Sequence, residues 1–125
     1  MVPAAGRVLV VDDHKEIRDL VGMVLSDEGY EVVTAPDGAV ALKRCAEYPP
    51  SVVLLDMQMP VMDGWEFARR YRQTPGPHAP IVVMTAAQDA RHRAAQIGAD
   101  GYLAKPFDLD DLVRCVERFT AGKAA

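Results

Sequence analysis

Residues 52–56 read VVLLD, a run of β-branched and aliphatic side chains that ends on an aspartate. The same pattern returns as VLVVDD in residues 8–13, as IVVMT in residues 81–85 and, in shorter form, as YLAK in residues 102–105. The three longer runs lack strict alternation, which is typical of strands that are buried on both faces of a parallel sheet. They predict a parallel sheet that is sandwiched between layers of helices.

Each of these four runs ends on a polar side chain, and the carboxyl ends of parallel strands share one edge of the sheet, where ligands bind. The residues expected to converge there are Asp12, Asp13, Asp56, Thr85 and Lys105. Three carboxylates so close would raise each other's pKa unless a cation lay among them, and Mg²⁺ prefers such oxygen ligands. The sequence therefore predicts a metal-dependent acidic pocket in which Lys105 and Thr85 bind something anionic.

Helical patterns separate the predicted strands along the whole chain. We expect strands at residues 7–11, 31–35, 51–55, 81–85 and 101–104. We expect helices around residues 17–25, from a cap at Asp37 to Pro49, at 65–73 after a cap at Asp63, at 89–97 before a stop at Gly98, and from Asp108 onward. Five βα units in this order call for right-handed crossovers and an α/β doubly wound three-layer sandwich.

The composition indicates one domain with its own core, since the chain has 125 residues and half of them are apolar. A net charge of −4 argues against binding nucleic acid through bulk electrostatics. No apolar run approaches the roughly 20 residues that span a bilayer, and residues 1–6 lack the features of a signal peptide. Cys45 and Cys115 have no metal-ligand spacing, so we expect two reduced cysteines in a cytoplasmic protein.

Taken singly, each polar residue at the sheet edge has a purely structural explanation. Asp12 and Asp13 could cap the following helix, Asp56 could be a turn residue, Thr85 could end a strand, and Lys105 could belong to a polar turn. Five such residues at four strand ends along one edge are hard to obtain by chance. Their combination favours a functional site.

Three motifs make the interpretation more specific. Residues 55–64 (LDMQMPVMDG), 83–87 (VMTAA) and 98–107 (GADGYLAKPF) together resemble a response-regulator receiver domain of two-component signalling. The similarity covers residues 6–120 and leaves 121–125 as a tail or the start of a linker. It implies a flavodoxin-like five-stranded parallel sheet in the order 2-1-3-4-5 with five helices.

The resemblance also implies the roles of the acidic residues. Asp56 matches the phosphoacceptor, whose carboxylate takes a phosphoryl group from a phosphohistidine on a partner and becomes an aspartyl phosphate. Asp12 and Asp13 match the acidic pair that holds Mg²⁺, together with Asp56 and the backbone carbonyl of Gln58. In the family the position of Asp12 binds the ion mostly through water. Lys105 matches the cation that pairs with a phosphoryl oxygen.

Three further positions match the family's switch, and a fourth matches a structural proline. Thr85 corresponds to the hydroxyl that binds the phosphoryl group after transfer, and the backbone N–H of Ala86 is expected to add a second donor. Tyr102 corresponds to the aromatic residue that turns inward when the hydroxyl moves, although an amphipathic ring half-buried on an edge strand explains it equally well. The bond that precedes Pro106 corresponds to a peptide bond that is typically cis in this family.

The same resemblance suggests partners: a histidine kinase or a histidine phosphotransfer protein that docks on the first helix. A helical wheel turns Ile17, Leu20 and Val24 toward the core, and Gly22 and Met23 away from it, which makes the last two candidates for docking. The fourth helix, fifth strand and fifth helix are expected to signal to a downstream effector or a second copy. We expect no direct nucleic-acid or membrane contact. The expected activity is that of a switch that assists its own phosphotransfer and slow dephosphorylation, rather than of a turnover enzyme.

Three other functions compete with this one. A haloacid-dehalogenase-type phosphatase needs a second aspartate two residues after the nucleophile, where this chain has Gln58. A flavodoxin-like or nucleotide-binding module needs a glycine-rich phosphate loop after the first strand, where this chain has Asp12, Asp13 and His14. A scaffold that has lost phosphotransfer is disfavoured by the intact Asp56, Thr85 and Lys105.

Overall fold

The computed structural model describes residues 6–121, in which strands and helices alternate throughout. The strands are β1 (Arg7–Val11), β2 (Glu31–Ala35), β3 (Val52–Asp56), β4 (Ile81–Ala86) and β5 (Gly101–Lys105). The helices are α1 (Lys15–Asp27), α2 (Gly38–Glu47), α3 (Gly64–Gln73), α4 (Ala87–Ile97) and α5 (Leu109–Thr120). The expectations about residues 1–5 and about the tail at 122–125 lie outside the described residues.

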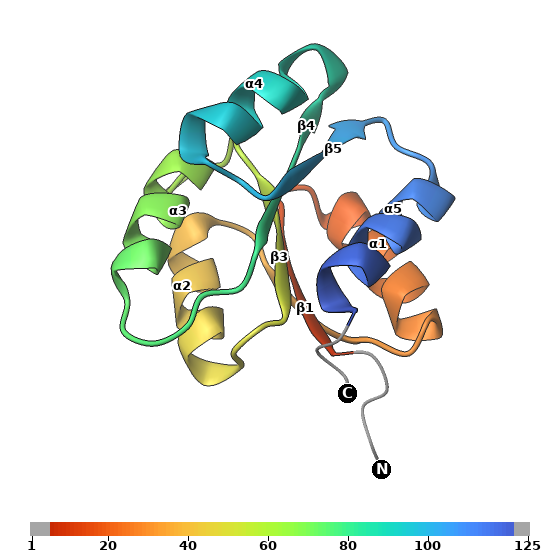
Figure 1. Cartoon of the computed structure of the whole chain (residues 1–125), viewed down its shortest axis with the longest axis horizontal. Coiled ribbons are helices and arrows are strands. Elements are labelled where there is room, and N and C mark those ends of the chain that lie inside the picture. Colours follow the sequence, from red (N-terminus) through yellow and green to blue (C-terminus); the bar gives the residue numbers. More distant parts are fainter. Residues whose placement is uncertain (1–5, 122–125) are drawn as a thin grey trace.

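All five strands are parallel and lie in the order β2-β1-β3-β4-β5, which confirms the predicted fold. Helices α1 and α5 cover one face of the sheet, and α2, α3 and α4 cover the other (Figure 1). The chain first moves outward from β1 to β2 and then returns to place β3 on the other side of β1. This change of direction lies at the carboxyl ends of β1 and β3, the usual ligand site of such sheets.

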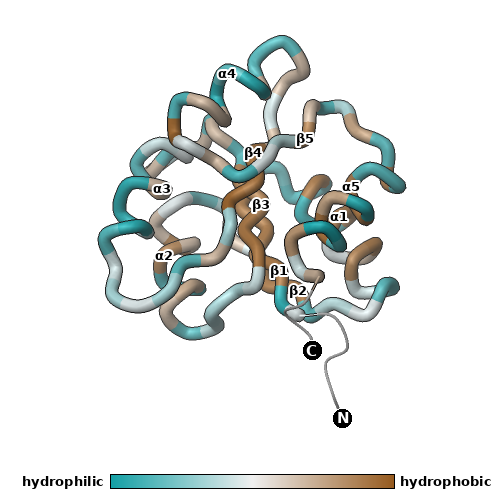
Figure 2. Tube along the Cα trace, viewed as in Figure 1, coloured by the Kyte–Doolittle hydropathy of each residue, from teal (hydrophilic) through white to brown (hydrophobic). Residues whose placement is uncertain are grey.

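The core consists of two apolar layers, one on each face of the central strands. In β3, Val53 and Leu55 pack toward α2 and α3, whereas Val52 and Leu54 pack toward α1 and α5, and all four are fully buried. The brown centre of Figure 2 marks this continuous apolar sheet. Because successive side chains enter opposite layers that are both apolar, the sequence of the strand shows no alternation.

Side-chain caps fix the starts of the two helices that follow β2 and β3. The carboxylate of Asp37 accepts a hydrogen bond from the N–H of Val40 at 2.9 Å, and that of Asp63 accepts one from Glu66 at 3.0 Å. Helix α4 ends as expected at Gly98, which has φ = 62°. It begins at Ala87 rather than at Asp89, because β4 passes directly into the helix without a capping side chain.

The helical wheel was wrong for two positions on α1. Val21 and Leu25 are the fully buried residues of the helix, while 40% of Leu20 is exposed. Gly22 is half-buried, and a Cβ there would lie 3.7 Å from the side chain of Val32 in β2. The helix is rotated relative to the expected orientation because α1 packs over both β1 and the edge strand β2.

Cys45 and Cys115 are both free, and they pack into opposite apolar layers of the sandwich, so they cannot form a disulfide with each other. Burial raises the pKa of the Cys45 thiol to about 12. Within residues 6–121, none of the helices has the length and apolar character needed to cross a membrane.

Candidate functional site

Residues from four different strands meet at the carboxyl edge of the sheet. Asp12 follows β1, Asp56 ends β3, Thr85 is the penultimate residue of β4, and Lys105 ends β5. Asp12 is fully buried, and Asp56 and Thr85 are only 6% and 7% exposed. The structure thus brings together the residues that the strand-end pattern singled out.

Both carboxylate oxygens of Asp12 are engaged by protein donors. The ammonium of Lys105 lies 2.7 Å from Oδ2, and the backbone N–H of His14 donates to Oδ1 at 2.9 Å. The same ammonium is 3.8 Å from Oδ1 of Asp56. Lys105 therefore sits between two buried carboxylates and partly neutralises them, while Asp12 holds it in place.

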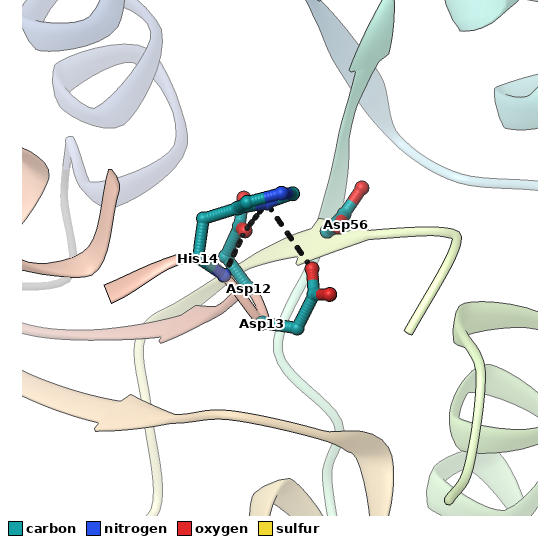
Figure 3. A group of neighbouring side chains, drawn as sticks. All are labelled: Asp12, Asp13, His14 and Asp56. Carbon is teal, nitrogen blue, oxygen red and sulfur yellow. Dashed lines mark hydrogen bonds and ion pairs between the residues drawn. The ribbon is translucent and has the colours of Figure 1, made fainter. Parts of the chain in front are cut away.

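Asp13 is the carboxylate with free binding capacity. Its Oδ1 is buried and has no hydrogen-bond partner among the described residues. One side-chain ligand atom from each of Asp12, Asp13, His14 and Asp56 lies within 4.8 Å of the others (Figure 3). A set of carboxylate oxygens, one of them buried and without a hydrogen bond among the described residues, fits a hard divalent ion such as Mg²⁺.

The carboxyl group of Asp56 has a strongly shifted pKa. Burial raises its pKa to about 6, the negative charges of Asp12 and Asp13 act in the same direction, and Lys105 opposes the rise. The ionised carboxylate is therefore held in the folded protein at a cost in free energy. A carboxylate of this kind is a good nucleophile and a strong ligand once a cation offsets its charge.

Replacing Asp56 with asparagine should stabilise the protein at neutral pH when divalent ions are absent. The folded-state pKa of about 6 exceeds the ordinary value of 3.8, so the wild type loses stability as the pH rises between these values. The variant escapes this loss, and its advantage should grow from nearly zero below pH ~4 to about 1–3 kcal/mol above pH ~6. Urea denaturation across this pH range measures it. An advantage that does not change with pH would contradict the assignment.

The loop between β3 and α3 is shaped by close backbone contacts. A Cβ at Gly64 would lie 2.9 Å from the carbonyl oxygen of Asp56 and 2.6 Å from the sulfur of Met57, so only glycine fits. Val61 has a positive φ of 67° although it is β-branched, and it is 84% exposed. This tight loop carries the backbone of Gln58 directly past the end of β3.

The proposed switch residues lie side by side on β4 and β5. Thr85 pairs in register with Ala104, and Tyr102 is two residues earlier on β5, so Thr85 and Tyr102 share one face with a small residue beside them. Tyr102 is 47% exposed, which places its ring outward. Ala86 pairs with Lys105, and the peptide bond from Lys105 to Pro106 is cis.

Sequence reasoning assigned no role to two residues that contact the site. The guanidinium of Arg18 donates to the backbone carbonyl of Asp12 at 2.8 Å and so holds the loop between β1 and α1. The Nδ1 atom of His14 lies 3.1 Å from Asp12 and 3.2 Å from Asp13, and the hydrogen bond to Asp12 and the charges of both aspartates raise the pKa of the imidazole. The histidine directly after two aspartates was the available signal.

Comparison with known proteins places the chain in a family. The model of the response regulator receiver domain matches residues 8–117. The response regulator MprA of Mycobacterium sp. strain KMS is 44% identical over 109 residues, which cover 86% of this chain and 47% of that protein. The chain thus spans about half the length of the curated relatives it matches.

Solved structures agree with this result. A putative response regulator from Chloroflexus aurantiacus has a TM-score of 0.85 and 34% identity, and the match covers 94% of this chain and 98% of that one. The chemotaxis response regulator CheY4 of Vibrio cholerae has a TM-score of 0.82 and 36% identity, with 92% and 98% covered. The chain belongs to the response-regulator receiver domain family of two-component signalling systems.

Proposed function

We propose that the chain takes a phosphoryl group from a phosphohistidine onto Asp56 in a Mg²⁺-dependent reaction and then changes a distant surface. The observation that carries this proposal is the position of Asp56. Its buried carboxylate ends β3, faces the ammonium of Lys105 at 3.8 Å, and lies beside Asp13, which has a buried oxygen without a hydrogen bond among the described residues. The family membership supports the same function in general terms.

The chemistry is an in-line displacement at phosphorus. A carboxylate oxygen of Asp56 forms a bond to phosphorus while the bond to the histidine nitrogen breaks, and the imidazole leaves with the electron pair. Lys105 neutralises charge that develops on a phosphoryl oxygen, and Asp12 keeps it in position. Asp13, Asp56 and the Gln58 carbonyl would hold Mg²⁺, with Asp12 acting mostly through water. When bound, the ion supplies further neutralisation of the phosphoryl oxygens.

The proposed switch begins when the Thr85 hydroxyl and the Ala86 N–H bind the new phosphoryl oxygens. Tyr102 then turns inward from its exposed position, past the small side chain of Ala104. Helix α4 is held to the sheet by small buried residues, Ala90 and Ala94. Because little apolar area is buried there, α4 is suited to move.

Replacing Thr85 with alanine should separate phosphorylation from the conformational change. In the wild type, phosphorylation should alter amide exchange from Ala86 to Ala104, whereas in Thr85→Ala the change should be much smaller. A coupling of about 1–3 kcal/mol is expected, so the unphosphorylated protein also visits the active form. Thr85→Ser keeps the hydroxyl and serves as the matched control. The same exchange pattern in Thr85→Ala and wild type would show that another residue relays the signal.

Residues 6–120 would form the receiver module, and residues 121–125 a tail or the start of a linker. A histidine kinase or histidine phosphotransfer protein would dock on α1, where 58% of Met23 and 40% of Leu20 are exposed. An effector or a second copy would bind the surface formed by α4, β5 and α5. We place this signalling switch, which is not a turnover enzyme, in the cytoplasm, as the free Cys45 and Cys115 favour.

Phosphotransfer profiling tests the proposal directly. The chain is incubated with Mg²⁺ and a panel of autophosphorylated histidine kinases, or with a small phosphodonor, and intact mass spectrometry counts the phosphoryl groups. One group, removable by hydroxylamine as expected for an acyl phosphate, supports the proposal. Failure to accept a phosphoryl group from any donor would contradict it.

A further inference from the structure

His14 brings an imidazole nitrogen to the rim of the acidic pocket. Its backbone precedes α1 in an extended conformation, and 64% of its side chain is exposed. Its Nδ1 nevertheless faces inward, 3.1 Å from Oδ1 of Asp12 and 3.2 Å from Oδ1 of Asp13 (Figure 3). The nitrogen and one carboxylate oxygen from each of Asp12, Asp13 and Asp56 all lie within 4.8 Å of one another.

These distances match the spacing of neighbouring ligands around a small metal ion. Bonds of about 2.1 Å separate adjacent ligands by about 3.0 Å in an octahedral site and by about 3.4 Å in a tetrahedral one. The Nδ1 atom approaches Asp13 at 3.2 Å, yet Oδ1 of Asp13 has no hydrogen-bond partner among the described residues. The two atoms therefore lie at ion-pair distance without a hydrogen bond, and both belong to the cluster whose ligand atoms lie within 4.8 Å of one another.

A nitrogen ligand changes which ion the pocket prefers. Mg²⁺ favours oxygen ligands only, whereas Zn²⁺ and Co²⁺ bind imidazole well and carboxylates readily. We propose that His14 joins Asp13 and Asp56 in a mixed nitrogen–oxygen site that selects a Zn²⁺-type transition ion over Mg²⁺. The inference rests on the proposed function in one respect, because both ions would use the same two carboxylates. A bound transition ion would then compete with Mg²⁺ for this site.

The test compares wild type, His14→Ala and His92→Ala, the last being a control that removes an exposed histidine on α4. Dissociation constants for Mg²⁺ and Zn²⁺ are measured by titration at about pH 8, above the ordinary pKa of an imidazole. The preference for Zn²⁺ over Mg²⁺ should fall at least tenfold in His14→Ala and should not change in His92→Ala. Tenfold is roughly the smallest loss of affinity seen when even the partner of a metal ligand is removed. Thermal unfolding of the ion-free proteins verifies that all three fold.

Co²⁺ supplies a direct readout of the nitrogen ligand. The proton NMR spectrum of the Co²⁺-loaded wild type should contain a strongly shifted, exchangeable imidazole N–H signal that is absent from His14→Ala. If the signal is missing from the wild type, or if the ion preference is the same with and without His14, the imidazole is only a partner for Asp12 and the inference fails. A wild type that binds Zn²⁺ through His14 but not Mg²⁺ upholds the inference and contradicts the proposed function. Binding of neither ion overturns both.

Discussion

Replacing Asp56 with alanine should abolish phosphorylation completely, both by a small phosphodonor and by a phosphorylated kinase. Asp56 is the carboxylate that ends β3 beside Lys105, and its removal leaves no acceptor oxygen at that point of the pocket. The wild type should gain one phosphoryl group in the presence of Mg²⁺, as counted by intact mass spectrometry. The variant should gain none.

A neighbouring carboxylate is the main alternative acceptor, since Asp12 and Asp13 lie in the same pocket. Asp12 is fully buried and bound to Lys105, whereas Asp13 is more accessible. Peptide mapping of the phosphorylated wild type therefore accompanies the mass measurement. Asp110→Ala, which removes an exposed aspartate on α5, should be phosphorylated like the wild type. Modification of Asp56→Ala to the wild-type extent would transfer the acceptor role to another residue.

The fold was predictable because its strands are specified by local composition. Apolar runs such as VVLLD in residues 52–56 have no polar face to expose, so they require cover on both sides and hence a parallel sheet between helices. That their polar ends lie at one edge then follows from the geometry of the sheet, because Asp56 and Lys105 both end parallel strands. The caps at Asp37 and Asp63 were likewise readable, because their signal lies within one helical turn.

Features that depend on packing between distant elements were not predictable in this way. The spacing of Leu20 on α1 is compatible with the core, but the rotation of the helix is decided by β2, which the helical wheel does not include. The contacts of His14 and Arg18 with the pocket depend on the path of the loop after β1. Even the early start of α4 at Ala87 reflects how β4 enters the helix. Local pattern predicted which residues meet at the sheet edge, whereas the contacts that His14 and Arg18 make with them depend on tertiary geometry.

Replacing Asp13 with alanine should weaken Mg²⁺ binding by more than about a hundredfold, because even disturbing the partner of a metal ligand costs about 10–100-fold in affinity. The prediction singles out Asp13 within the acidic pair. Both oxygens of Asp12 already accept hydrogen bonds from Lys105 and from the His14 N–H, whereas Oδ1 of Asp13 is buried and has no hydrogen bond among the described residues. Titration followed by NMR or calorimetry measures the affinity, and stabilisation of the fold by added Mg²⁺ provides an independent measure.

Loss of negative charge alone must be distinguished from loss of a ligand. Glu16→Gln removes a charge from the first turn of α1 without removing a carboxylate from the cluster, so it should change Mg²⁺ affinity only slightly, and less so at high salt. Asp13→Asn keeps one carbonyl oxygen and should fall between wild type and Asp13→Ala. Equal losses in Glu16→Gln and Asp13→Ala would mean that the pocket attracts cations only through its overall field. A Mg²⁺ affinity that falls stepwise from wild type to Asp13→Asn to Asp13→Ala would instead identify Asp13 as a ligand. Only direct coordination is sensitive to which atom remains at this position.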